Sequence, residues 1–191
     1  MVCDHAGPYP LQWGGFRFLS VWVCACTGFT FTFNVHNLTA ASVVDSAEIV
    51  LNHVKTQTQY RWQRLRSDRG SDWTSNMLGG WMKREVLVHQ LASPDAYGHI
   101  GIAESKIKTL NERARVLMVA SGAPPNFCFH AIEMVNGFIN RTGHTITNGV
   151  RWWGVTPVVL SQSRFWTAGD HGRVDESAKR QAITSYLVYL S

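Results

Sequence analysis

Three acidic residues far apart in the sequence are the strongest candidates for chemistry: Asp4, Asp68 and Glu104. Asp68 follows a strand-like run of apolar and basic residues, and Glu104 stands in the first turn of a predicted helix. Only the fold can bring such residues together. Converging carboxylates repel one another unless divalent cations lie between them, and hard oxygen ligands suit Mg²⁺ or Mn²⁺. The three acids therefore predict a metal site for one of these ions.

Each acid also has an explanation without chemistry. Asp68 and Glu104 lie close to predicted helix starts, where the helix dipole favours a negative charge. Asp4 stands near the start of the sequence and could simply be solvated. The positions of the three side chains in the fold decide between these interpretations.

Length and charge set broad limits on the protein. Its 191 residues suit one domain with a single core, and 18 Lys and Arg against 13 Asp and Glu give a net charge of +5. This modest basic excess is compatible with a polyanionic partner. No apolar run reaches the length of about 18 residues that a membrane span needs, so we expect no membrane partner.

The acids are embedded in an alternation of strand and helix patterns. A short first strand should carry Asp4 at or near its end, and residues 16–26 and 29–36 predict two further strands, all antiparallel. A helical period over residues 39–55 predicts a crossover helix, so the next strand, over residues 60–66, should run parallel to its predecessor. This strand leads to Asp68, at an edge where α/β sheets bind ligands.

The rest of the chain is mostly helical. The patterns predict a helix over 73–85, a strand over 86–91, a loop over 93–101, a long helix from 102 that carries Glu104 away from its apolar stripe, and a helix over 126–140.

The element order and the positions of the acids resemble the ribonuclease H-like fold. That resemblance implies an α/β protein whose five-stranded mixed sheet has helices on both faces. The motifs are similar to those of the integrase catalytic core of Ty1/copia-type retrotransposons, with 35 residues between Asp68 and Glu104, the family's spacing. The motifs are Asp4-His5-Ala6-Gly7-Pro8, Ser67-Asp68-Arg69-Gly70-Ser71-Asp72-Trp73-Thr74-Ser75 and Gly101-Ile102-Ala103-Glu104. The resemblance implies a core domain over residues 1–158 and a divergent tail over 159–191.

The resemblance also implies a function. Asp4, Asp68 and Glu104 would hold two Mg²⁺ or Mn²⁺ ions that support phosphodiester cleavage and strand transfer. The partners would be DNA, as element ends and target, and a further copy of the chain. The location would be the nucleus, or the cytoplasm within a retroelement particle.

Several basic residues extend this prediction to DNA contacts. Lys106, Lys108, Arg113 and Arg115 are candidates to follow phosphates, and a solvated helix face explains them equally well. His99 is a further candidate for a nucleic-acid contact. His5 and His99 could also assist proton transfer, although surface or packed histidines are more common. The arginines before Asp68 are interpreted as an exposed strand face: Arg61, Arg64 and Arg66.

Departures from the family pattern leave two alternative functions. Ile100 stands where the family has an amide, Asp95 adds a negative charge to the loop, and Arg69 replaces an Asn beside Asp68. These changes are typical of a degenerate copy, which would be an inactive remnant that binds nucleic acid or protein. The second alternative is a nuclease that cuts without joining.

Overall fold

The computed structural model describes residues 1–92 and 101–141, and all of them belong to one compact unit, Met1–Leu160. The predicted boundary between residues 158 and 159 and the predicted tail lie outside the described residues. Within them, no helix combines the length and the apolar character that crossing a membrane requires.

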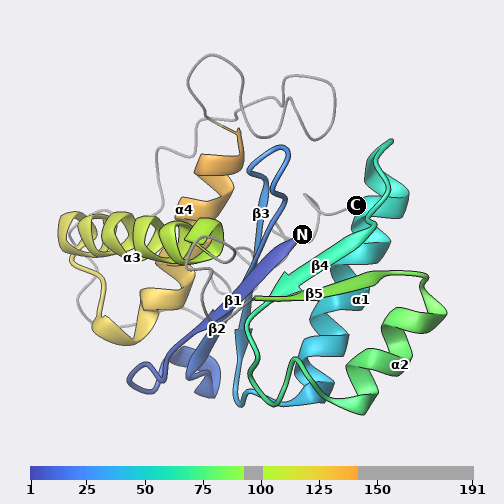
Figure 1. Ribbon diagram of the computed structural model, residues 1–191. Coiled ribbons are helices and arrows are strands. Elements are labelled where there is room, and N and C mark those ends of the chain that lie inside the picture. Colours follow the sequence, from blue (N-terminus) through green and yellow to red (C-terminus); the bar gives the residue numbers. More distant parts are fainter. Residues whose placement is uncertain (93–100, 142–191) are drawn as a thin grey trace. The chain divides into compact units, whose positions relative to one another are not determined.

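A five-stranded mixed sheet forms the centre of the fold (Figure 1). The strand order is β3-β2-β1-β4-β5; β1, β2 and β3 pair in antiparallel fashion, β4 runs parallel to β1, and β5 runs parallel to β4. The α/β class and the mixed sheet are therefore as predicted. The strands are β1 (Val2–Ala6), β2 (Phe18–Val23), β3 (Thr30–Val35), β4 (Arg64–Ser67) and β5 (Val88–Leu91).

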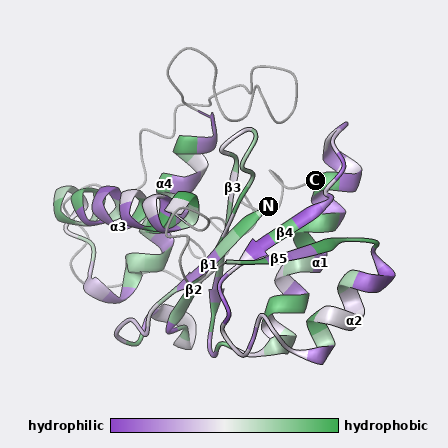
Figure 2. Cartoon of the chain, viewed as in Figure 1, coloured by the Kyte–Doolittle hydropathy of each residue, from purple (hydrophilic) through white to green (hydrophobic). Residues whose placement is uncertain are grey.

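Helices cover both faces of this sheet, also as predicted. One core joins α1 and α2 to the sheet around Trp22, Leu65 and Trp81, and a second joins α3 and α4 to it around Leu19, Val21 and Phe129. Figure 2 shows the apolar stripes of these helices. The helices are α1 (Ala40–Gln57), α2 (Asn76–Arg84), α3 (Gly101–Ser121) and α4 (Cys128–Arg141), with short 3-10 helices at Trp13–Gly15 and Pro125–Phe127.

Helix ends explain where the observed elements depart from the predicted ones. The predicted helix over 73–85 begins later, at Asn76, because the Ser75 hydroxyl accepts a hydrogen bond from the Leu78 N–H (3.2 Å). At its other end Val86 adopts φ 57°, and the Leu87 N–H reaches the Met82 carbonyl (2.9 Å). This Schellman-type end occupies the residues before Val88, so β5 is shorter than expected.

Strand β1 separates two environments because neighbouring side chains on a strand point to opposite faces. Val2 belongs to the core under α3 and α4, whereas Cys3 belongs to the core under α1 and α2. The same alternation places Asp4 on the α3 side and His5 on the α1 and α2 side. The two candidate site residues of this strand therefore have different surroundings.

Candidate active site

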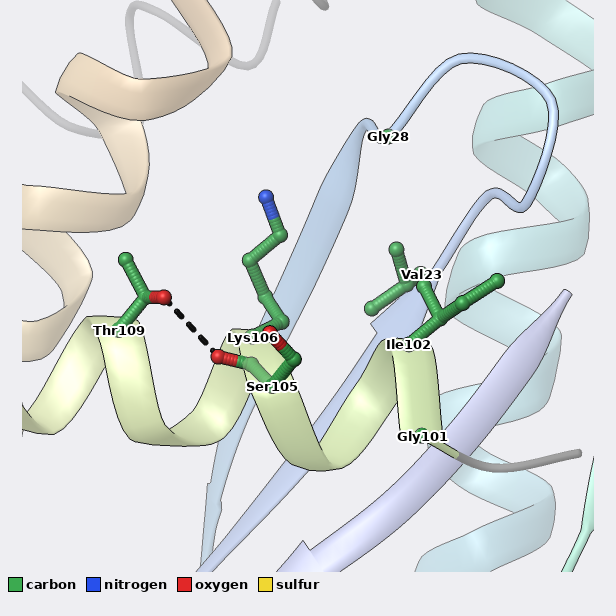
Figure 3. A pocket seen from close by; sticks show the side chains of 7 residues that line it. All are labelled: Val23, Gly28, Gly101, Ile102, Ser105, Lys106 and Thr109. Atoms are coloured by element: carbon green, nitrogen blue, oxygen red, sulfur yellow. Dashed lines mark hydrogen bonds between the residues drawn. The ribbon is translucent and has the colours of Figure 1, made fainter. Parts of the chain in front are cut away.

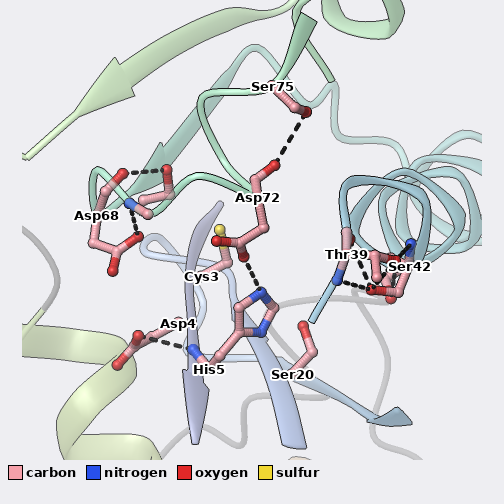
Figure 4. Close-up of polar contacts among 12 residues, drawn as sticks. Cys3, Asp4, His5, Ser20, Thr39, Ser42, Asp68, Asp72 and Ser75 are labelled. Carbon is pink, nitrogen blue, oxygen red and sulfur yellow. Dashed lines mark hydrogen bonds and ion pairs between the residues drawn. The ribbon is translucent and has the colours of Figure 1, made fainter. Parts of the chain in front are cut away.

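Asp4 lies in the middle of β1, not at or near its end as predicted. The strand continues to Ala6 because residues 4–6 keep their pairing with β2, where Asp4 is opposite Val21. One oxygen of the Asp4 carboxylate accepts a hydrogen bond from the His5 backbone N–H (2.8 Å). Figure 4 shows the carboxylate directed toward α3, on the other side of β1 from His5.

The electrostatic surroundings of Asp4 disfavour its charged form. Burial raises the pKa of the Asp4 carboxyl to about 6; its hydrogen bond with His5 acts against this rise, while the negative charges of Asp68 and Glu104 add to it. Asp68 and Glu104 are thus close enough for their charges to act on Asp4. The three predicted acids surround one region of the fold.

Asp68 follows β4 directly, as predicted, and is fixed by a tight turn. Its Oδ1 accepts a hydrogen bond from the Gly70 N–H (3.0 Å). A Cβ atom at position 70 would lie 2.6 Å from Asp72 Oδ1 and 3.2 Å from Asp68 Oδ1. Because real Cβ atoms do not approach other atoms at 2.6 Å, this turn requires a glycine between the two carboxylates.

His5 and Asp72 connect the turn of Asp68 to strand β1. His5 Nε2 lies 3.0 Å from Asp72 Oδ2, within ion-pair distance, and the His5 ring stacks on Trp73 with 4.6 Å between centroids and 15° between planes. Burial lowers the pKa of His5, although the Asp72 carboxylate opposes this shift. His5 is therefore a packed histidine that connects the strand of Asp4 to the turn of Asp68 (Figure 4).

Glu104 occupies the first turn of α3 and is exposed. A link to the loop after β1 holds this helix in place, because the Tyr9 hydroxyl donates a hydrogen bond to Asn111 Oδ1 (3.0 Å) and the Tyr9 ring packs edge-on against Phe129. Asn111 lies two turns after Glu104 on the same side of the helix. The contact therefore ties the face that carries Glu104 to the strand that carries Asp4.

The three acids approach one another without forming a closed ligand set. Across residues 1–92 and 101–141, no three His, Cys, Asp or Glu side chains lie close enough together to hold a metal ion. The donor chemistry nonetheless fits Mg²⁺ or Mn²⁺, because the acids supply hard carboxylate oxygens and Asp4 is destabilised by negative charge that a cation would neutralise. The assignment of Asp4, Asp68 and Glu104 as metal ligands remains a prediction.

The four basic residues predicted to follow phosphates do not share one surface. With 3.6 residues per turn, Lys108 and Arg115 lie on the Glu104 side of α3, whereas Lys106 and Arg113 lie on the opposite side. Lys106 lines a cavity of about 470 Å³ with Gly28 of the β2–β3 hairpin (Figure 3). Burial and the charge of Arg113 lower the pKa of Lys106.

Some predicted positions cannot be placed, and some structural roles had no signal in the sequence. His99, Ile100 and Asp95 lie outside the described residues. Asp72 belongs to the motif around Asp68, but its contact with His5 was not predicted from the sequence. The signal that could have indicated a role for Asp72 is the pair of acids on either side of Gly70. No local pattern indicated the contact between Tyr9 and Asn111.

Two comparisons connect the chain to retroelement proteins. It is 28% identical over 89 residues to the retrovirus-related Pol polyprotein from transposon TNT 1-94 of Nicotiana tabacum, covering 47% of this chain and 7% of the relative. It is 28% identical over 108 residues to the transposon Ty1-DR4 Gag-Pol polyprotein of Saccharomyces cerevisiae, covering 56% of this chain and 7% of the relative. The chain thus matches only a small part of each polyprotein. No protein-family model matches the chain.

Two integrase catalytic cores and an intasome chain are among the solved structures that share this fold. The catalytic core domain of BIV integrase aligns with a TM-score of 0.60 at 16% identity, covering 79% of this chain and 91% of that one. The HTLV-2 integrase core in complex with magnesium aligns with a TM-score of 0.57 at 12% identity, covering 74% of this chain and 84% of that one. A chain of a simian T-cell lymphotropic virus intasome aligns with a TM-score of 0.64 at 13% identity, covering 91% of this chain and 59% of that one. The protein has the ribonuclease H-like integrase-core fold, and its resemblance to Ty1/copia-type retroelement proteins is confirmed.

Proposed function

We propose that this protein is the catalytic core of a copia-like integrase, a polynucleotidyl transferase that cleaves DNA phosphodiester bonds and transfers the resulting strand. The observation that carries the proposal is the placement of three acids in an integrase-core fold: Asp4 within β1, Asp68 directly after the adjacent strand β4, and Glu104 in the first turn of α3, which packs on this sheet. Burial raises the pKa of Asp4 to about 6, and the charges of Asp68 and Glu104 add to that rise.

Each acid has a distinct support in the chain. β1 holds Asp4 rigidly because its backbone pairs with β2, the Gly70 turn holds Asp68 Oδ1, and α3 presents Glu104 at its exposed first turn. These residues would bind two Mg²⁺ or Mn²⁺ ions. When bound, such ions would activate the attacking oxygen and stabilise the leaving oxygen of an in-line displacement at phosphorus.

The solved structures bear on the metal and the oligomer by analogy. One aligned core was solved with magnesium and another within an intasome, which favours a divalent metal and an oligomer for this chain too. We propose DNA ends and target DNA as substrates, with action in the nucleus or, within a retroelement particle, in the cytoplasm.

An inactive remnant is the second candidate function. It is favoured by the absence, within the described residues, of any three metal-ligating side chains at coordination distance. Arg69 also differs from the family pattern, and its guanidinium donates to the Ala92 carbonyl (3.0 Å) beside the Asp68 turn. In this alternative the fold persists as a module that binds nucleic acid or protein.

Metal binding and cleavage together test the proposal. Mn²⁺ binding is measured by calorimetry, and cleavage of a branched DNA substrate is measured in Mn²⁺, for the natural chain, Asp68→Asn and the control Asp45→Asn, which changes an exposed acid on α1. We expect Asp68→Asn alone to lose both. If the natural chain binds no Mn²⁺ and cuts nothing, the remnant alternative replaces the enzyme; cleavage that survives Asp68→Asn would refute the assigned site.

A further inference from the structure

A second cavity lies where β1 and β4 begin and β2 ends. Its volume is about 320 Å³, and three arginines line it: Arg61, Arg64 and Arg66. Tyr60, a residue that is 44% exposed, lines it as well. None of the described residues that line the cavity is acidic. The cavity therefore combines concentrated positive charge with an aromatic surface.

Two of these arginines are available to a ligand. Arg61 and Arg64 are exposed, and within residues 1–92 and 101–141 neither guanidinium makes a hydrogen bond or an ion pair. Arg66 is held in place, because its Nε donates to Gln90 Oε1 (2.9 Å) on the adjacent strand. One oriented arginine beside two free ones provides the donors that a phosphate accepts.

The register of the sheet relates this cavity to the acids. Arg66 pairs with Val2 in the parallel ladder, so its side chain shares the sheet face of Val2 and Asp4. Arg64 and Arg66 lie on one face of β4, and Asp68 follows the end of the strand; four residues of extended chain span about 13 Å. Figure 2 shows β4 as largely hydrophilic. A basic track thus leads from the cavity toward the Asp68 turn.

We propose that Arg61, Arg64 and Arg66 form a second phosphate-binding site, which holds the backbone of a nucleic-acid strand away from the reacting phosphate. Arg64 and Arg66 stand two residues apart on one strand face, about 6.6 Å, a separation suited to successive phosphates of an extended strand. The exposed Tyr60 ring offers a surface on which a base stacks. The choice of a nucleic acid rests on the proposed function, whereas the phosphate site does not.

Strand binding without divalent metal tests this site. The probe is a fluorescein-labelled DNA single strand of about 20 nucleotides, longer than a typical binding site, and its anisotropy is titrated in EDTA at several salt concentrations. The variant Arg61→Gln/Arg64→Gln is compared with Lys83→Gln/Arg84→Gln, which removes two exposed charges from α2. We expect about tenfold weaker binding and a salt slope lower by about 1.4 for the first pair, and less than a twofold change for the control.

Other outcomes would overturn the proposal. Equal losses in both pairs would mean that only net charge matters, and an unchanged affinity of the first pair would exclude the site. If AMP or inorganic phosphate binds as tightly as the strand, the ligand is a free phosphate compound; if poly-glutamate competes equally, the surface accepts any polyanion. If the glutamine pair fails to fold, Arg61→Lys/Arg64→Lys is titrated instead. Lysine keeps the charge and loses bidentate donation, so we expect an unchanged salt slope and weaker binding, and an unchanged affinity would exclude the site.

The outcome is independent of catalysis. The titration contains EDTA, so it reports strand binding without metal-dependent cleavage. Cleavage that survives Asp68→Asn would remove the proposed active site and leave the arginine site to be judged by anisotropy alone.

Discussion

Asp4 and His5 are neighbours in the sequence but face opposite sides of the sheet, and their surroundings differ in kind. The His5 ring is packed on Trp73, and its Nε2 lies at ion-pair distance from the Asp72 carboxylate. Asp4 has a single hydrogen bond and two negative neighbours that raise its pKa. The packing of His5 on the α1 and α2 side of β1 therefore stabilises the fold, whereas the Asp4 carboxylate on the α3 side destabilises it.

The packed face should dominate the free energy of unfolding. Trp73 is 2% exposed and contacts both His5 and Trp22, so Trp73→Ala should destabilise the fold by about 3–5 kcal/mol. Trp13→Ala is the control, because Trp13 is 46% exposed, and should cost less than about 1 kcal/mol. Urea denaturation measures both; similar losses would contradict the special role of this face.

On the α3 side of β1, mutation of Asp4 should raise the free energy of unfolding instead of lowering it. Asp4→Asn removes a destabilised carboxylate, so at pH 8 the metal-free protein should gain about 1–2 kcal/mol, a value reduced for solvent screening. Metal-dependent cleavage should be lost. Denaturation at pH 8 and an activity assay measure these effects, and a variant less stable than the natural chain would contradict the comparison.

The same contrast predicts opposite pH dependences. The folded pKa of Asp4 lies above its unfolded value of 3.8, so its contribution to stability is full below pH 3.8 and is lost as the pH rises through about 6. The folded pKa of His5 is lowered from 6.5, so its contribution is full above pH 6.5 and is lost as the pH falls. Denaturation is measured from pH 4 to 8. Asp4→Asn should remove the loss of stability with rising pH, and His5→Gln should remove the loss of stability with falling pH.

Gly70 stands where the two faces meet, between Asp68 and Asp72. Gly70→Ala should displace one of these carboxylates, because its Cβ would lie 2.6 Å from Asp72 Oδ1. We expect a loss of about 1 kcal/mol and at least about a tenfold loss of cleavage. Gly80→Ala, with no atom within 4 Å of its Cβ in α2, should instead stabilise the protein slightly. If Gly70→Ala and Gly80→Ala changed stability and cleavage equally, the turn at Gly70 would not be what positions Asp68 and Asp72.

The smallest expected effect compares one helix end from each face. α2 and α3 both end with a left-handed residue, Val86 at φ 57° and Gly122 at φ 64°. A β-branched residue is strained there, so Val86→Gly should stabilise by about 0.5–1 kcal/mol and Gly122→Ala should destabilise by about 1 kcal/mol. Thermal unfolding measures both, and no gain for Val86→Gly would mean that the αL strain is relieved by other contacts.

The sequence alone determined the order of elements, the α/β class and the location of Asp68 after a parallel strand. These features follow from side-chain periods of 2 and 3.6, which are local and therefore readable without coordinates. The periods did not fix the ends of β5 or α2, because end positions depend on single hydrogen bonds such as Leu78 to Ser75.

Tertiary structure alone decided which distant residues meet. The partnership of His5 with Asp72 and the contact between Tyr9 and Asn111 connect segments whose separation in sequence carries no period. Even the environment of Asp4 depends on Glu104, 100 residues later, because α3 packs over β1. Packing, not local pattern, places these charges together.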